Sequence, residues 1–165
     1  APTAAPTTAP TAPPPAAPAP VDVAAANPAV VPNGTVVNAG SWAYTYGGIK
    51  NIGTGAYGGA PPTRGQYQIT LLAVANNSGA PATIPDGFFV LKDAQGRVYD
   101  FNRAASVDYL NRFGGPGVAA DISADANVPN NRLLSSVALL FDVSPDATNL
   151  VLFSRENPTQ GFLIR

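Results

Sequence analysis

Residues 66–76 read QYQITLLAVAN, which is the clearest β-strand pattern in the chain. Apolar side chains alternate with polar ones along it: Tyr67, Ile69, Leu71 and Ala73 with Gln66, Gln68 and Thr70. Successive side chains of a strand point to opposite faces of a sheet, so the alternation predicts a strand with one buried face. Asn77-Ser78-Gly79 then favour a turn that ends the strand.

Strand patterns recur on both sides of this segment. Trp42, Tyr44 and Tyr46 repeat with period two, which predicts a strand whose three rings face the core. We expect a hairpin with strands at 88–91 and 97–101, further strands at 133–143, 149–154 and 161–164, one short helix at 104–112, and a glycine-rich loop at 47–62. Short strands separated by turn signals predict an all-β fold for residues 38–165, either an immunoglobulin-like sandwich or a small β-barrel.

The N-terminal region has a different composition. Residues 1–20 contain only Ala, Pro and Thr, so we expect an extended polyproline II segment there. One interpretation is a solvated stalk with O-linked sugars, for which the candidate sites are Thr3, Thr7, Thr8 and Thr11. Residues 21–37 carry short runs of β-formers broken by prolines, which predict pieces of edge strand. Residues 1–37 are therefore expected to form an extended, Pro-rich N-terminal arm.

Three of the strand patterns are apolar on both faces: residues 71–74, 88–91 and 150–153. In a sandwich with one solvated side the outward positions should be polar, so something is expected to cover them. Loops such as residues 47–62 are one candidate. The alternative is the arm of a neighbouring copy, added to an edge or groove by β-augmentation. The candidate subunit-interface residues are then Val21, Val23, Ala25, Val30, Val31, Val36 and Val37.

Charge and composition limit the classes of partner and the cellular location that we expect for this protein. Nine basic residues nearly balance ten acidic ones. The sequence therefore has no basic stripe of the kind that binds nucleic acid, and we expect no nucleic-acid partner. No apolar run approaches the roughly 20 residues that span a bilayer. Charged residues make up only 12% while Gly and Pro are abundant, which is typical of exported β-rich proteins. The start at Ala1 rather than Met fits an exported product whose signal has been removed. We expect an extracellular or cell-surface location.

Side chains for catalysis are scarce. The chain has no His and no Cys, which excludes Ser-His-Asp triads, Cys nucleophiles and ordinary zinc sites. We therefore expect neither an enzyme nor a cofactor. Asp121 and Asp125 lie in a turn-rich segment and are the best calcium candidates, but no calcium-loop spacing is present, so we expect no metal site.

Several motifs resemble those of a widespread exported bacterial domain-of-unknown-function family. They are GQYQITL at 65–71, NNSG at 76–79, IP at 84–85, FFVLKD at 88–93, GRVY at 96–99 and LLFDV at 139–143. The resemblance covers about residues 42–153 and consists of strand and turn features. It implies an immunoglobulin-like β-sandwich, related in fold to a secreted mycobacterial antigen and attached to a lipoprotein anchor by a low-complexity linker. This chain departs from that pattern because it has no anchoring Cys.

The long N-terminal arm also makes the chain similar in architecture to protomers of extracellular bacterial fibrils. In those protomers a β-barrel stalk carries a long N-terminal strand that runs into neighbouring subunits. Together these features predict a structural subunit of an extracellular filament, a helical homo-oligomer assembled head to tail by its arm. The alternative is a monomeric, stalked cell-surface or solute-binding module.

Overall fold

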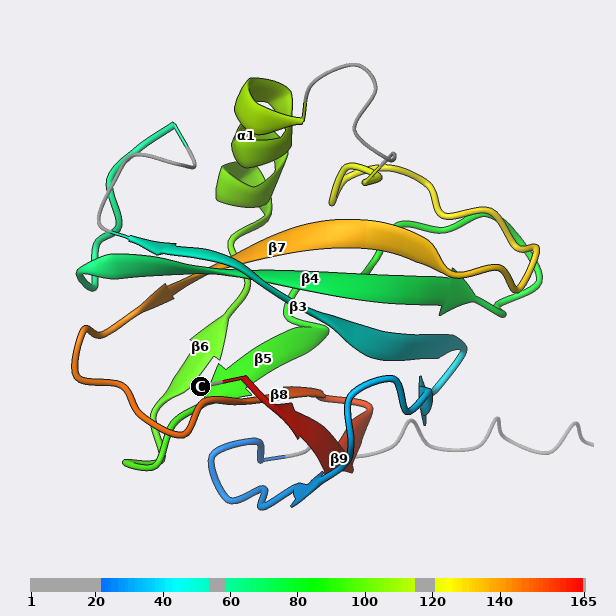
Figure 1. Ribbon diagram of the computed structural model, residues 1–165. Helices are drawn as coiled ribbons and strands as arrows, with labels where there is room; N and C mark the ends of the chain where they lie inside the picture. The colour runs from blue at the N-terminus through cyan, green and yellow to red at the C-terminus, as the bar shows by residue number, and fades with distance from the viewer. Residues whose placement is uncertain (1–21, 54–58, 115–120, 165) are drawn as a thin grey trace, which may run out of the picture.

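The computed structural model describes residues 22–53, 59–114 and 121–164 (Figure 1). The side chains of residues 49–53 are not described. The elements are β1 (Ala29–Val30), β2 (Val37–Ala39), β3 (Trp42–Gly53), β4 (Gln66–Asn76), β5 (Phe89–Lys92), β6 (Val98–Asp100), α1 (Arg103–Phe113), β7 (Ser135–Val143), β8 (Val151–Ser154) and β9 (Asn157–Leu163). The predicted all-β fold is confirmed, and β4 has the bounds that the sequence predicts.

The described strands form two open sheets that pack face to face. Sheet A has the order β1-β9-β8-β5-β6, and sheet B has the order β2-β3-β4-β7. Of the two predicted architectures, the sandwich is therefore the one present. Helix α1 lies over the outer face of sheet B, and residues 22–27 lie on the opposite side of the molecule, against sheet A (Figure 1).

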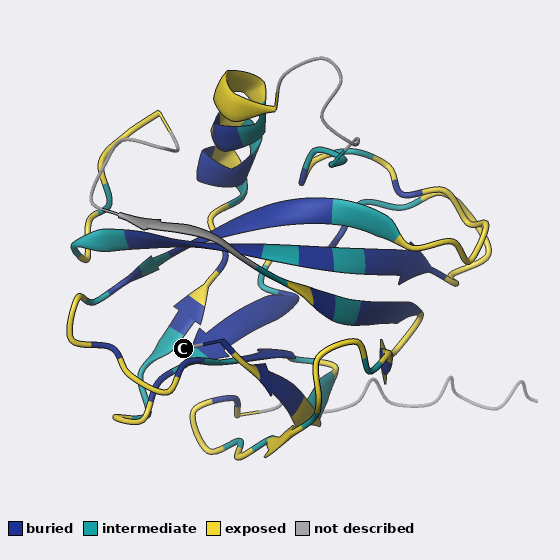
Figure 2. Cartoon of the chain, in the orientation of Figure 1, coloured by how far each residue is buried: buried dark blue, intermediate teal, exposed yellow. Residues whose placement is uncertain are grey.

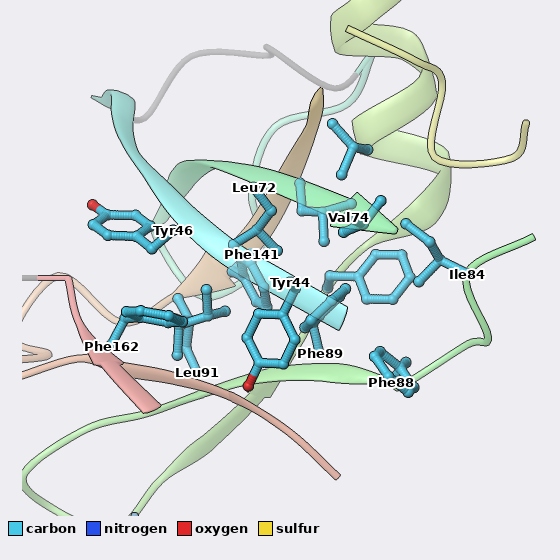
Figure 3. Close-up of a cluster of buried hydrophobic side chains, with 14 of the residues drawn as sticks. Tyr44, Tyr46, Leu72, Val74, Ile84, Phe88, Phe89, Leu91, Phe141 and Phe162 are labelled. Carbon is cyan, nitrogen blue, oxygen red and sulfur yellow. The ribbon is translucent and has the colours of Figure 1, made fainter. Parts of the chain in front are cut away.

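The main core lies between the two sheets, where buried positions concentrate (Figure 2). Trp42, Tyr44 and Tyr46 are all buried and belong to this core, which confirms the predicted aromatic stripe. The Tyr44 ring lies edge-on to Phe89 and Phe162 of sheet A, with ring centroids 4.9 and 5.9 Å apart (Figure 3). Edge-to-face contacts of this kind stabilise a core beyond the area that they bury. The stripe thus joins the two sheets.

The Tyr44 hydroxyl offers a test of this junction. It accepts a hydrogen bond from the Ser154 amide at 3.2 Å, and burial raises the Tyr44 pKa. Tyr44→Phe would leave the Ser154 amide unpaired inside the core, so we expect a loss of about 1–3 kcal/mol in the free energy of unfolding. Urea denaturation measures it. Tyr46→Phe is the control, because the Tyr46 hydroxyl points away from the cluster in Figure 3, and an equal loss in both variants would contradict the prediction.

Helix α1 covers the outer face of sheet B. Asn102 caps it: the Asn102 side chain accepts a hydrogen bond from the Ala105 amide at 3.0 Å. Ala105 and Tyr109 of the helix pack on outward-facing side chains of β4 and β7, which include Tyr67, Ile69, Ala138 and Leu140. Tyr67 and Ile69, two apolar outer positions of β4, are therefore covered by this chain itself.

The edge of β7 is also occupied by the helix and the segment before it. The Asn102 amide donates to the Leu140 carbonyl at 2.7 Å, and the Leu140 amide donates to the Ser106 hydroxyl at 2.9 Å. Phe101 and Ile122 make single β-bridges to the same strand. These contacts use backbone groups that a neighbouring strand would otherwise need.

The loop predicted at residues 47–62 is in part wrong. β3 continues through this glycine-rich stretch to Gly53, which pairs with Tyr67 of β4. Two register shifts, between Tyr46 and Gly48 and between Ile49 and Asn51, interrupt the ladder. Gly48 has φ +130°, a backbone conformation open to glycine, so the irregular strand can bend and still pair with β4. Residues 54–58 lie outside the described part.

Candidate interaction surface

The outer face of sheet A carries an apolar patch. Alternation along each strand sends Phe89, Leu91 and Leu152 into the main core and leaves their neighbours facing outward. The outward set is Val90 of β5, Val98 of β6, and Val151 and Phe153 of β8. Val90 and Phe153 are nevertheless fully buried. Something must therefore cover them.

The cover is an N-terminal segment of the same chain, residues 22–27, which we call the strap. Val23 is 7% exposed and packs with Val90 and Phe153, and Ala26 packs against the same cluster. The Lys92 ammonium donates hydrogen bonds to the carbonyls of Ala24 and Ala26, both at 2.6 Å. We call Lys92, Val90, Val98, Val151 and Phe153 the seat of the strap. The seat joins an apolar surface to a cation that binds backbone carbonyls.

Edge strand was predicted in pieces within residues 21–37, and at residues 23–25 this prediction is wrong, because they form a turn. The Asp22 carboxylate accepts a hydrogen bond from the Ala24 amide at 3.0 Å. An aspartate that binds the amide two residues later competes with extended pairing and favours a turn. Val23 is the one buried side chain of this turn.

The chain beyond the strap returns to both sheets. β1 pairs in parallel with β9 through Ala29 and Gln160 and through Val30 and Gly161. β2 then pairs with β3 from Val37 to Ala39. The boundary predicted between residues 37 and 38 falls inside this packed region.

The candidate interface residues fall into three groups. Val23 and Val37 are buried in this chain, and Val31 packs partly buried against the main core. Ala25 is exposed, and Val30 and Val36 are 55% and 51% exposed. Val21 and the four glycosylation candidates, Thr3, Thr7, Thr8 and Thr11, lie outside the described residues. Of the candidate interface residues that the structure describes, Val23 is therefore the one that contacts the seat.

Open hollows flank the strap on two sides. Lys92, Gln95 and Asn149 line one of them with Asn27 of the strap. Pro158 and Thr159 of β9 line the other with Asp22 and Ala25. The strap is thus bordered by open surface on both of these sides.

The hairpin beside the seat is held by a buried carboxylate. Asp93 is 4% exposed and accepts hydrogen bonds from the Arg97 guanidinium, the Tyr99 hydroxyl and the amides of Gln95 and Arg97. Burial alone would raise the Asp93 pKa, but these hydrogen bonds outweigh it and lower the pKa below its usual value. The network fixes the turn between β5, which carries Lys92, and β6.

The predicted calcium candidates do not form a metal cluster. Asp125 lies with Asp86, Asp108 and Arg103 around one open pocket, which Asp121 does not line. Arg103 forms an ion pair with Asp86 at 2.7 Å. Across the ranges that the structure describes, no group of three or more His, Cys, Asp or Glu side chains could hold a metal ion.

Sequence reasoning missed the role of Lys92. The available signal was its position, since it ends the apolar run FFVLK and is one of two lysines in the chain. No helix within the described residues has the length and apolar character needed to cross a membrane. No family model, curated protein or solved structure matches the chain.

Proposed function

We propose that this protein is a non-enzymatic structural subunit outside the cell, whose copies join head to tail through the N-terminal arm. The observation that supports this most directly is the strap. A sandwich that served only as a rigid module could place polar residues on the outer face of sheet A. This chain instead has an apolar patch there, closed by a short N-terminal segment of the described residues.

A second function has its own support. The strap already lies on its own sandwich, and α1 covers the other outer face, so the apolar surfaces that favour assembly are satisfied within one chain. A monomeric module carried on an Ala/Pro/Thr stalk would have the same arrangement. The two functions differ in whether the full chain associates with itself.

The two functions are distinguished with the full chain and two matched variants. Wild type is expected to sediment as species that grow with concentration and to form filaments in negative-stain electron microscopy. Val23→Asp should abolish this, because the carboxylate would be desolvated against the apolar side chains of Val90 and Phe153. Ala25→Asp adds the same charge at an exposed position and should assemble as wild type does.

Two results would contradict the assembly function. A wild-type chain that stays monomeric at every concentration would favour the stalked module. Filaments from Val23→Asp equal to those of wild type would place the connection outside the strap. Circular dichroism of all three proteins checks that each variant keeps its strands.

A further inference from the structure

We propose that the strap exchanges between copies, so that the strap of one chain occupies the seat of the next. This inference rests on the proposed assembly function and specifies the docking site. The partner is a second copy of this chain, and the site is the outer face of sheet A.

The chemistry of the seat matches the strap itself. The seat offers an apolar surface formed by Val90 and Phe153, and beside it the Lys92 ammonium. The strap offers Val23 to that surface and the carbonyls of Ala24 and Ala26 to the ammonium. A strap from another copy has the same side chain and the same two carbonyls, so it can form every contact that the resident strap forms.

The strap is held by few contacts. Of residues 22–30, only Val23 is buried. β1 adds two paired residues, and the Val31 amide donates to the Gly161 carbonyl at 2.9 Å. Segments with so few buried contacts open at a small fraction of the cost of global unfolding. The strap and β1 can therefore leave while the other four strands of sheet A and the whole of sheet B stay folded.

A hinge lies where the exchange needs one. Residues 32–35 form a turn in which the Thr35 amide donates to the Pro32 carbonyl at 3.1 Å. Gly34 in this turn has φ +88°, and no atom lies within 4 Å of the position that a Cβ atom would take. After the turn, Val37 is fixed in the main core. Rotation within residues 32–36 would swing the strap away and leave β2 in place.

The sheet edges are poorer acceptors than the seat. β1 has two residues and β2 and β6 have three each, so an added strand would gain few ladder hydrogen bonds. The edge of β7 is bonded to Asn102 and Ser106. The strap and the seat are different surfaces, so each copy can give its strap to one neighbour and receive the strap of another. An assembly of this kind keeps a free strap at one end and a free seat at the other, so it can grow by adding copies.

Complementation between two full-chain variants tests the exchange. Val23→Asp has a defective strap and an intact seat. Lys92→Glu has an intact strap and a defective seat, because a carboxylate there repels the carbonyls that Lys92 binds. Each variant alone is expected to be monomeric in sedimentation velocity. Mixed at equal concentration, they should form dimers of one chain of each kind and nothing larger, since only one strap and one seat can engage.

Lys92→Arg is the matched control, because it keeps the cation and the donors and should assemble as wild type does. A mixture that stays monomeric, while wild type forms filaments that depend on Val23, would overturn the exchange and leave the assembly function standing. Filaments from Lys92→Glu alone would overturn the assigned seat. A wild-type chain that never associates would overturn both this inference and the assembly function.

Discussion

Asp93→Ala is expected to lower the free energy of unfolding by about 3–5 kcal/mol near neutral pH. The Asp93 side chain is fully buried and is the acceptor for the Arg97 guanidinium, the Tyr99 hydroxyl and two backbone amides. Removing it leaves the amides of Gln95 and Arg97 and the Tyr99 hydroxyl without that acceptor. Guanidinium chloride denaturation followed by tryptophan fluorescence would measure the loss.

The same carboxylate makes the loss depend on pH. The folded-state pKa of Asp93 lies below its unfolded value, so its contribution is present above the unfolded pKa and is lost as pH falls through the folded pKa. The difference between wild type and Asp93→Ala should therefore shrink from about pH 5 toward pH 2. Asp146→Ala is the matched control: Asp146 pairs with the same Arg97, but its side chain is 70% exposed, and we expect a loss of at most about 1 kcal/mol. Equal losses in the two variants would contradict the assigned network.

Phe89→Ala is expected to cost about 3–5 kcal/mol, because it removes a ring from the centre of the main core. Phe89 is 1% exposed and lies edge-on to Tyr44 and Phe88, with ring centroids 4.9 and 4.8 Å away (Figure 3). The cavity would weaken the contact between the sheets. Thermal unfolding by calorimetry measures the effect, which should appear as a large drop in Tm.

Phe113→Ala is the control for this prediction. Phe113 ends α1 and is 54% exposed, so the same truncation removes much less buried surface. We expect a change of well under half that of Phe89→Ala. A similar drop in Tm for both variants would mean that the core between the sheets does not dominate the stability of the fold.

The strap changes what assembly requires. The sequence shows apolar positions on both faces of several strands, which the arm of a neighbouring copy would cover. In the structure α1 covers one outer face and the strap covers the other, both from the same chain. Assembly therefore requires a contact to be exchanged rather than a bare surface to be filled. Complementation between defective straps and defective seats separates these two situations.

The fold of the N-terminal arm depends little on its own residue pattern. The sequence predicts Val23 as a contact residue within an edge strand, but the Asp22 side chain accepts a hydrogen bond from the Ala24 amide and the segment turns. The sequence places Val37 in the arm, whereas in the structure its side chain completes the main core beside Tyr44, its partner in β3. Short segments carry too little periodicity to reveal which distant surface they contact.

The sequence by itself determined the strands with strong period-two patterns, namely the stripe from Trp42 to Tyr46, the strand at residues 66–76 and the hairpin around Asp93. These depend on local alternation and turn residues, which act over a few positions of the chain. Only the tertiary structure decided what covers the two outer faces and that Lys92 holds the strap. Both depend on contacts between residues far apart in the chain, such as Val23 with Val90 and Phe153. Local periodicity indicates that a side chain is buried. Which segment covers that side chain depends on how the whole chain packs.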